Sequence, residues 1–384
     1  MLLCAGLVSI FAAPPIGSLS DRMPWSPRLG RRAPLILLGA VLGALTNAMM
    51  LRAQTVGEFA LWYSLLTVAS LLTSVPFNAL TMDVVPADAR GFASGAIGSA
   101  QHGGNLIGAL VSLRYAEFSP GALAALMAAM LVGGALVTAL GNREPPPPPP
   151  PPRGGAPVAG GPLARVGRIV CDYLSPLIHH ADFRWVFITR LLMQQGVYTV
   201  QEFLLYWMQD MVVRPAGVGA ARAVGIAMLL LLAAALVAAG AGGRASDAMG
   251  GRRKAIVYGS GACMAAASLV GAAATAWPLA LCVAFFFGLG YGAFLAVDYA
   301  LVLDVLPSAA DSAKDLAVWH ASLVLPQLMA TPIAGGLLDH FQRGAAAAPA
   351  GSFAAHLGYS VVFWLATAYF VLATVLVRRI KKVR

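Results

Sequence analysis

The stretches "GSLSDRMPWSPRLGRR" at residues 17–32 and "GRASDAMGGRR" at residues 243–253 are two copies of one motif. Each copy has a Ser-Asp pair followed by Gly-Arg-Arg, and each comes directly after a long apolar run. The shorter matches "DVVP" at 83–86 and "DVLP" at 304–307 have the same spacing in sequence as the two Gly-Arg-Arg triplets at 30–32 and 251–253. Because the same signals recur in the same order, the chain is predicted to consist of two parallel repeats of one helical bundle.

The composition indicates a membrane protein. Only 11% of the 384 residues are charged and 59% are hydrophobic, whereas soluble proteins carry about 25% charged residues. The net charge of +10 comes mainly from short segments between apolar runs, so it indicates membrane topology rather than binding to nucleic acid. The N-terminal "MLLCAGLVSIFAAPP" lacks the basic n-region of a signal peptide and is predicted to be a span.

Apolar runs long enough to cross a ~30 Å hydrocarbon core predict about eleven transmembrane helices. They lie near 1–19, 33–52, 57–80, 91–113, 119–141, 185–209, 218–241, 255–274, 277–302, 315–337 and 357–378. The fold class is therefore all-α and polytopic. Arginine-rich loops alternate with loops poor in Lys and Arg. The positive-inside rule then places both copies of the motif, the central loop and the C-terminus in the cytoplasm.

A proline-rich stretch divides the chain into the predicted parts 1–141, an N-terminal bundle, 142–184, a cytoplasmic linker, and 185–384, a C-terminal bundle. The segment "EPPPPPPPPRGGAPVAGG" is typical of a stiff polyproline II linker that becomes flexible. The following "VGRIVCDYLSPLIHHADF" is either a partly amphipathic helix on the membrane surface or plain linker.

These features resemble the major facilitator superfamily. The form "SDR…GRR", with "AVDYALVLDVLP" and "AKDLAVW", is similar to its sucrose-transporter-like and glycoside–pentoside–hexuronide cation symporter branch. The resemblance covers essentially the whole chain and implies a transporter of small solutes. The residues that carry it are Gly17, Ser20, Asp21, Arg22, Gly30, Arg31 and Arg32, with a weaker second copy at Ser246, Asp247, Gly251, Arg252 and Arg253.

The first copy of the motif is preceded by one apolar run, and the second by two, at 185–209 and 218–241. The superfamily plan has twelve spans, so the sequence as written is expected to lack the first of them. A mis-set start site and a truncated variant both explain this pattern, and it leaves the activity of the chain as written open.

The motif carries the candidate gate. Asp21 and Asp247 are expected at cytoplasmic helix ends, where carboxylates can pair with arginines in contacts that break when the gate opens. The alternative is that these charges only determine the membrane topology. The predicted gating residues are Asp21, Arg22, Arg31, Arg32, Arg90, Asp247, Arg252 and Arg253.

Asp298 is the predicted coupling residue. Ionisable side chains within spans are functional candidates by default. The equivalent position in the first repeat is Phe77, so the repeat itself does not require a carboxylate there. The alternative is a carboxylate that pairs with a buried donor for structure alone.

The span near 185–209 is unusually polar. Gln194 and Gln201 share one helix face, and Gln195 and Glu202 share another. Arg190 and Glu202 lie twelve residues apart, roughly 18 Å along the axis, so each needs a partner elsewhere. Either these groups bind a hydroxyl-rich solute, or Arg190 and Glu202 reach the two membrane interfaces. The predicted substrate-binding residues are Arg190, Gln194, Gln201, Glu202 and, in the span near 91–113, Asn105.

The sequence holds no Walker A motif, nucleophile elbow or His-Glu-x-x-His, so we expect neither an ATP-driven pump nor another enzyme. No cofactor and no metal are expected. The leading hypothesis is a monomeric, multi-pass transporter of the plasma membrane. Its partners would be the lipid bilayer, a proton (or sodium) and a small polar solute, a sugar or glycoside, moved by rocker-switch alternating access. The alternative is a truncated, transport-inactive paralogue that acts as a membrane sensor or interaction partner.

Overall fold

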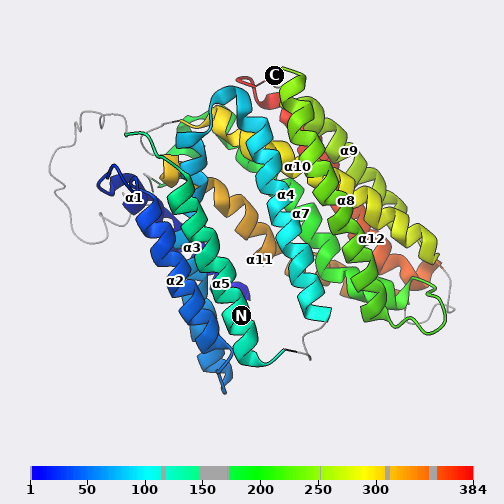
Figure 1. The fold of residues 1–384 in the computed structure, drawn as a ribbon. Coiled ribbons are helices and arrows are strands. Elements are labelled where there is room, and N and C mark those ends of the chain that lie inside the picture. Colours follow the sequence, from blue (N-terminus) through cyan, green and yellow to red (C-terminus); the bar gives the residue numbers. More distant parts are fainter. Residues whose placement is uncertain are drawn as a thin grey trace. The chain divides into compact units, whose positions relative to one another are not determined.

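The computed structural model describes residues 2–113, 118–146, 171, 173–250, 252–307, 312–345 and 353–383. Within them the chain is helical, and eleven long helices follow the predicted spans in order (Figure 1). Most of the predicted linker 142–184, and Gly251 of the second motif, lie outside these residues. The helices are α1 (Leu2–Arg22), α2 (Ala33–Met50), α3 (Val56–Val84), α4 (Arg90–Leu113), α5 (Pro120–Gly141), α7 (Ala181–Asp210), α8 (Ala220–Ala248), α9 (Arg253–Gly271), α10 (Trp277–Val305), α11 (Ser312–Ala345) and α12 (Phe353–Leu376).

Several helices continue beyond the apolar runs that predict them. The predicted span near 218–241 becomes α8, which ends at Ala248, and the one near 57–80 becomes α3, which ends at Val84. Hydropathy finds only the part of a helix that lies in hydrocarbon, whereas backbone hydrogen bonds carry the helix into the polar interface. The Ser-Asp pair of each motif consequently lies on the last turns of a helix, α1 or α8.

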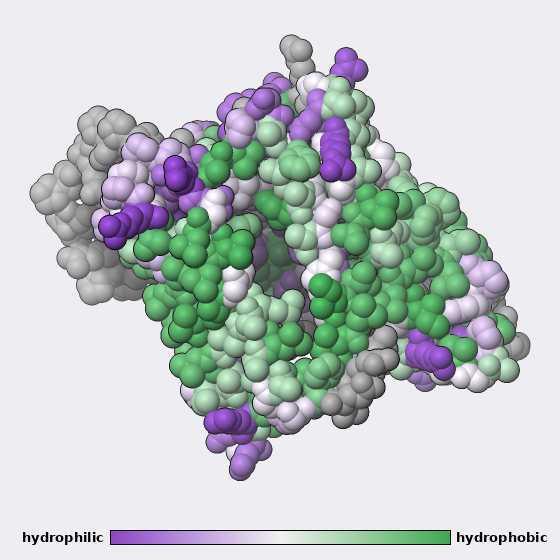
Figure 2. Space-filling view, in the orientation of Figure 1, coloured by the Kyte–Doolittle hydropathy of each residue, from purple (hydrophilic) through white to green (hydrophobic). Residues whose placement is uncertain are grey.

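Eight helices of the described chain are long and apolar enough to cross a bilayer: α2, α3, α5, α8, α9, α10, α11 and α12. Figure 2 shows apolar residues over the flanks of the helices and hydrophilic residues gathered at their ends. Many large apolar side chains, such as Val137 and Leu140, are exposed on the helices. A surface of this kind suits contact with lipid tails.

The helices form two compact units. Unit 1 comprises residues 1–86, 115–184 and 306–324, and unit 2 comprises 87–114, 185–305 and 325–384. This is a different partition from the predicted bundles 1–141 and 185–384, because α4 packs against α8 and α10 in unit 2. The division into the two predicted bundles stays a prediction.

Unit 1 is built around α2, α3 and α5. A small core cluster of Ile36, Ala40, Leu80 and Ala135 joins these three helices, and α1 packs on α3. Figure 1 draws α2, α3 and α5 side by side.

In unit 2, α10 packs against α8, α9 and α4. Side chains added at Gly288 and Gly292 of α10 would collide with the backbone carbonyls of Leu231 and Ala235 on α8. The two glycines therefore allow α8 and α10 to lie in direct backbone contact, as small residues do in membrane helices. This close approach places the middle of α10, including Asp298, in a buried position.

The two units repeat the same packing. Helices α3 and α10 both have 29 residues, and their starts at Val56 and Trp277 have the same spacing in sequence as the two Gly-Arg-Arg triplets. The contacts α1–α3, α2–α3 and α2–α5 of unit 1 correspond to α8–α10, α9–α10 and α9–α12 of unit 2. The internal repeat predicted from the short motifs is thus present as a repeat of helix pairs.

Candidate functional site

The Gly-Arg-Arg triplet of unit 1, residues 30–32, binds the carboxylate of Glu144. Glu144, just after α5, accepts backbone hydrogen bonds from Arg31 (2.9 Å) and Arg32 (3.0 Å) and pairs with Arg31 Nε at 3.0 Å. Gly30 has φ +68°, and an added Cβ would collide with this carboxylate. The triplet therefore needs glycine both for its backbone conformation and for the space that Glu144 fills.

Gly30→Ala is expected to destabilise the protein more than Gly250→Ala. Both glycines have positive φ, +68° and +69°, and a non-glycine residue there costs about 1–2 kcal/mol. At Gly250 an added Cβ would meet nothing within 4 Å, whereas at Gly30 it displaces Glu144 from Arg31. The measurement is the apparent melting temperature of the purified variants. Equal losses at the two positions would show that the Glu144 contact adds nothing.

Arg32 is fully buried and lies at the centre of an ion-pair cluster in unit 1. Its Nε lies 2.6 Å from Asp83 Oδ2, and its Nη1 lies 3.2 Å from Asp21 Oδ1. It also donates hydrogen bonds to the hydroxyls of Ser20 and Ser312. One guanidinium thus links the ends of α1 and α3 with the start of α11, using the planar fork of donors that arginine offers.

Asp21 also caps a helix. Its carboxylate accepts hydrogen bonds from the backbone N–H groups of Ala313 (3.3 Å) and Lys314 (3.1 Å), in the first turn of α11. Free N–H groups and the helix dipole both favour an anion at this position. An added Cβ at Gly17 would lie 2.7 Å from the Ala313 carbonyl oxygen, so the small residue of the motif allows the two helices to approach.

Unit 2 holds the same arrangement. Asp247, near the end of α8, accepts hydrogen bonds from the backbone N–H groups of Gly91 (3.2 Å) and Phe92 (2.6 Å), in the first turn of α4. Gly243 takes the place of Gly17, since an added Cβ there would lie 2.5 Å from the Gly91 carbonyl oxygen. Each copy of the motif thus places one carboxylate at the N-terminus of a helix from the other half of the sequence.

The ion pairs of the two units also correspond. Arg253 Nη1 lies 2.8 Å from Asp304 Oδ2, and Arg90 Nη1 lies 3.2 Å from Asp304 Oδ1. The pair Arg253–Asp304 occupies the positions in the second repeat that Arg32–Asp83 occupies in the first. The predicted gating residues also include Arg22 and Arg252. Both side chains are exposed and make no ion pair with any described residue.

Three carboxylates of these clusters were not among the gating residues predicted from the sequence. Asp83 and Asp304 lie in the "DVVP" and "DVLP" matches, and the repeat spacing between them was a signal that pointed to them. Glu144 follows α5 at the edge of the proline-rich stretch, and no pattern in the sequence marks it as a partner of Arg31.

The coupling candidate Asp298 has a partner in unit 2. Arg190 Nη1 lies 3.1 Å from Asp298 Oδ2, and both side chains are buried, with 7% and 3% exposed. Arg190 thus lies buried against α10, and the alternative, that it reaches a membrane interface, stays a prediction. Its partner is on α10, which answers the requirement that Arg190 pair with a residue other than Glu202. Removing Arg190 would leave the buried Asp298 charge without this partner, which is strongly unfavourable.

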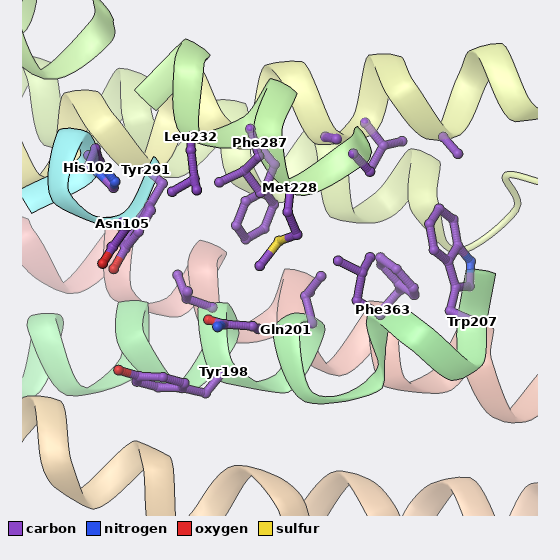
Figure 3. A pocket seen from close by; sticks show the side chains of 18 of the residues that line it. His102, Asn105, Tyr198, Gln201, Trp207, Met228, Leu232, Phe287, Tyr291 and Phe363 are labelled. Atoms are coloured by element: carbon purple, nitrogen blue, oxygen red, sulfur yellow. The ribbon is translucent and has the colours of Figure 1, made fainter. Parts of the chain in front are cut away.

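A cavity of about 410 Å³ lies within unit 2, between α4, α7, α8, α10 and α12 (Figure 3). Its polar lining includes His102 and Asn105 from α4, Tyr198 and Gln201 from α7, and Tyr291 from α10. His102 and Tyr291 meet edge to face, with ring centroids 5.3 Å apart. The remaining lining is mostly aliphatic and aromatic, so the cavity offers a few hydrogen-bonding groups in an apolar enclosure, as binding sites for small organic molecules do.

The predicted substrate-binding residues fall at different places. Asn105 and Gln201 line the cavity. Gln194 is buried and is not part of the lining. Glu202 is exposed and is not part of the lining. Tyr198 accepts a hydrogen bond of 2.6 Å from Gln327 on α11.

Known proteins share this fold. The sequence profile of the Major Facilitator Superfamily matches residues 1–313, and no curated protein sequence matches the chain. The human organic anion transporter MFSD10 (TETRAN) has a TM-score of 0.70 at 17% identity, over 98% of this chain and 83% of that chain.

FucP, a Major Facilitator Superfamily transporter solved in the outward conformation, has a TM-score of 0.67 at 15% identity, over 97% of this chain and 89% of that chain. A variant of the Escherichia coli fucose:proton symporter FucP gives 0.65 at 14% identity, over 97% and 91%. These likenesses concern the fold, and the profile match covers most of the sequence. The chain therefore belongs to the major facilitator superfamily and is a multi-pass membrane transporter of small solutes rather than an enzyme.

Proposed function

We propose that the chain is a proton-coupled secondary transporter of a small hydroxyl-rich solute, a sugar or a glycoside, and that it works by rocker-switch alternating access. The observation that carries this proposal is a cavity lined by neutral hydrogen-bonding groups, together with a buried ion pair on the helices that form it. Tyr198 and Arg190 belong to α7, and Tyr291 and Asp298 belong to α10. Each tyrosine is about two helical turns from the ion-pair residue on its own helix.

The ion pair gives a physical route to coupling. While Asp298 is ionised, its charge compensates that of Arg190, and the two neutralise each other in a buried site. If Asp298 takes up a proton, the pair gains a net positive charge, which favours a solute in the cavity whose hydroxyl oxygens turn toward it. Tyr198 and Tyr291 line the cavity on the same two helices that carry the pair. Proton uptake and solute binding therefore favour each other in this scheme.

The fold relatives support this proposal in part. One of them is named a fucose:proton symporter, which fits a sugar and a proton, whereas another is named an organic anion transporter. The described residues that line the cavity include no Lys, Arg, Asp or Glu. A neutral lining favours a neutral solute over an anion, because a desolvated charge needs a partner.

The two helix-capping carboxylates serve as the gate in this proposal. Asp21 holds α1 to the start of α11, and Asp247 holds α8 to the start of α4. Both contacts join helices from different halves of the sequence, so they must change if the two predicted bundles rock against each other. A charge at a helix N-terminus contributes about 0.3–2 kcal/mol, which is enough to bias a conformational equilibrium and weak enough to break during a transport cycle.

Asp21→Asn and Asp247→Asn are each expected to slow solute uptake by about threefold to tenfold, the factor that about 1 kcal/mol produces in an equilibrium. The asparagine keeps the size of the side chain and removes the charge that the helix dipole favours. Initial uptake rates into proteoliposomes, at matched amounts of folded protein, measure the effect. Arg22→Gln is the control, because Arg22 is exposed on the same helix end. If the two aspartate variants and the control transport at the same rate, these carboxylates are not a gate.

Uptake into proteoliposomes tests the function itself. With an imposed inward proton gradient, the purified protein should accumulate a labelled sugar or glycoside, and a protonophore should abolish the accumulation. Accumulation that follows a sodium gradient instead would assign sodium as the coupling ion and contradict the proposal. If a broad panel of sugars and glycosides shows neither uptake nor exchange, the transport-inactive alternative is favoured.

A further inference from the structure

The cavity of unit 2 has a polar end and an apolar end. His102, Asn105, Tyr198 and Tyr291 lie together at one end, and Trp207 and Phe363 lie at the other (Figure 3). Gln201, Phe287 and Met228 lie between the two ends. This arrangement arises because α7 and α10 run along the cavity, and each contributes lining residues to both ends of it.

The cavity is long for a single sugar ring. Tyr198 and Trp207 are nine residues apart on α7 and both line the cavity, which corresponds to roughly 13 Å along the helix. A pyranose ring with its hydroxyls would occupy only the polar end. The rest of the cavity is lined by Leu204, Met228, Leu231, Val283 and Phe287, side chains that form no hydrogen bond with a hydroxyl.

The polar end carries unpaired hydrogen-bonding atoms. His102 is 1% exposed, and neither of its ring nitrogens has a hydrogen-bond partner among the described residues. A buried imidazole without partners is unfavourable unless something else supplies them. A hydroxylated ring that reaches His102 and Asn105 would satisfy these atoms with donors and acceptors of its own.

The apolar end carries one further donor. Trp207 is 1% exposed and packs against Phe363 with ring centroids 5.2 Å apart. Its indole Nε1 also lacks a hydrogen-bond partner within the described part of the chain. Buried tryptophan N–H groups usually have a partner, so a ligand that fills this end would bring an apolar body and one acceptor.

We propose that this cavity binds glycosides with an apolar, aromatic aglycone in preference to free sugars. The sugar lies against His102, Asn105 and Tyr291, and the aglycone lies beside Phe287 and Met228 and extends toward Trp207. This inference rests on the proposed transport of sugars or glycosides and names the substrate class within it. The aglycone supplies the apolar surface that the cavity removes from water, and the sugar supplies the hydrogen bonds.

Ligand binding to the purified full-length protein tests this proposal. Equilibrium dialysis compares labelled glucose and galactose with their phenyl β-glycosides, and adds 4-nitrophenyl β-glucoside and benzoate. We expect each phenyl glycoside to bind at least about tenfold more tightly than its free sugar, from the added apolar contact. Equal affinity of the sugar and its phenyl glycoside overturns the proposal, as does tighter binding of benzoate, an aromatic anion without a sugar.

Ala284→Phe is the diagnostic variant, because Ala284 lines the cavity on α10 and the larger side chain fills its apolar part. It should remove the preference for phenyl glycosides and leave the affinity for free sugar within about twofold. Ala233→Phe is the matched control, since Ala233 is exposed on α8 and the same change should leave the preference intact. A variant that weakens sugar and phenyl glycoside equally would show that the aglycone does not occupy this end.

Trp207→Phe keeps the ring packing and removes the indole N–H, and it provides a second test if Ala284→Phe does not fold. It should weaken 4-nitrophenyl β-glucoside by about threefold to tenfold, the range for one hydrogen bond, and leave phenyl β-glucoside unchanged. No change for either ligand would contradict the assigned orientation. If the wild-type protein binds neither sugars nor glycosides, the proposed sugar transport fails with this inference. If it binds both equally, only the inference fails.

Discussion

Arg190→Gln is expected to lower the stability of the protein by about 3–5 kcal/mol, the range for removing one partner of a buried ion pair. Asp298 is 2% exposed, and its carboxylate lies 3.1 Å from the guanidinium. Without Arg190 this carboxylate either stays charged in a buried site or takes up a proton, and both outcomes are unfavourable relative to the pair. The expected result is a drop of several degrees in the apparent melting temperature, with a lower yield of folded protein.

The double variant Arg190→Gln/Asp298→Asn is the control for this prediction. It removes both charges and keeps two polar side chains, so no uncompensated charge remains and most of the lost stability should be recovered. If the double variant is as unstable as Arg190→Gln alone, the loss comes from packing around the arginine and not from the uncompensated charge of Asp298. An unchanged melting temperature in the single variant would show that the pair contributes nothing.

Arg32→Ala is the second substitution with a large expected effect. Arg32 is 0% exposed and pairs with both Asp21 and Asp83. Its removal leaves two partly buried carboxylates near one another and opens a gap between α1, α3 and α11, so a loss of about 3–5 kcal/mol is expected. The measurement is the apparent melting temperature, with the amount of protein that reaches the membrane as a second readout.

Arg22→Ala is the matched control for Arg32→Ala, because Arg22 belongs to the same motif but is exposed. Surface substitutions usually stay within about 0.5 kcal/mol. Topology signals count positive charges near a helix end whichever residue carries them. If Arg22→Ala and Arg32→Ala have the same effect, the two arginines act through membrane orientation alone, and the ion pairs of Arg32 are incidental.

Hydropathy alone predicted the helical part of the fold. The eleven apolar runs correspond to α1–α5 and α7–α12, because a helix in lipid must be long, apolar and internally hydrogen-bonded. The helix ends were less accurate, since the runs near 57–80 and 218–241 stop before α3 and α8 do, at Val84 and Ala248. The expectation that Asp21 and Asp247 lie at helix ends agrees with their positions in the last turns of α1 and α8.

The partners of the candidate residues could not be predicted, since they depend on how distant helices pack. Arg190 and Asp298 were each singled out, yet they lie far apart in the sequence, and nothing in one sequence indicates that α7 and α10 bring them together. The backbone N–H groups that Asp21 and Asp247 bind carry no sequence signal at all. Trp207 and Phe287 escaped notice because aromatic residues in an apolar helix are typical of ordinary core packing, and only the cavity distinguishes them.

The central claim, that the Asp298–Arg190 pair couples proton entry to solute movement, is tested most directly by Asp298→Asn in proteoliposomes. Two rates are measured on the same vesicles: accumulation driven by an imposed proton gradient, and exchange of labelled for unlabelled solute without a gradient. Asparagine resembles the protonated acid, so accumulation should disappear while exchange is partly retained. The control is Asp88→Asn, which changes an exposed carboxylate between α3 and α4 and should preserve both. If Asp298→Asn still accumulates solute against its gradient, Asp298 is structural and the coupling claim is contradicted.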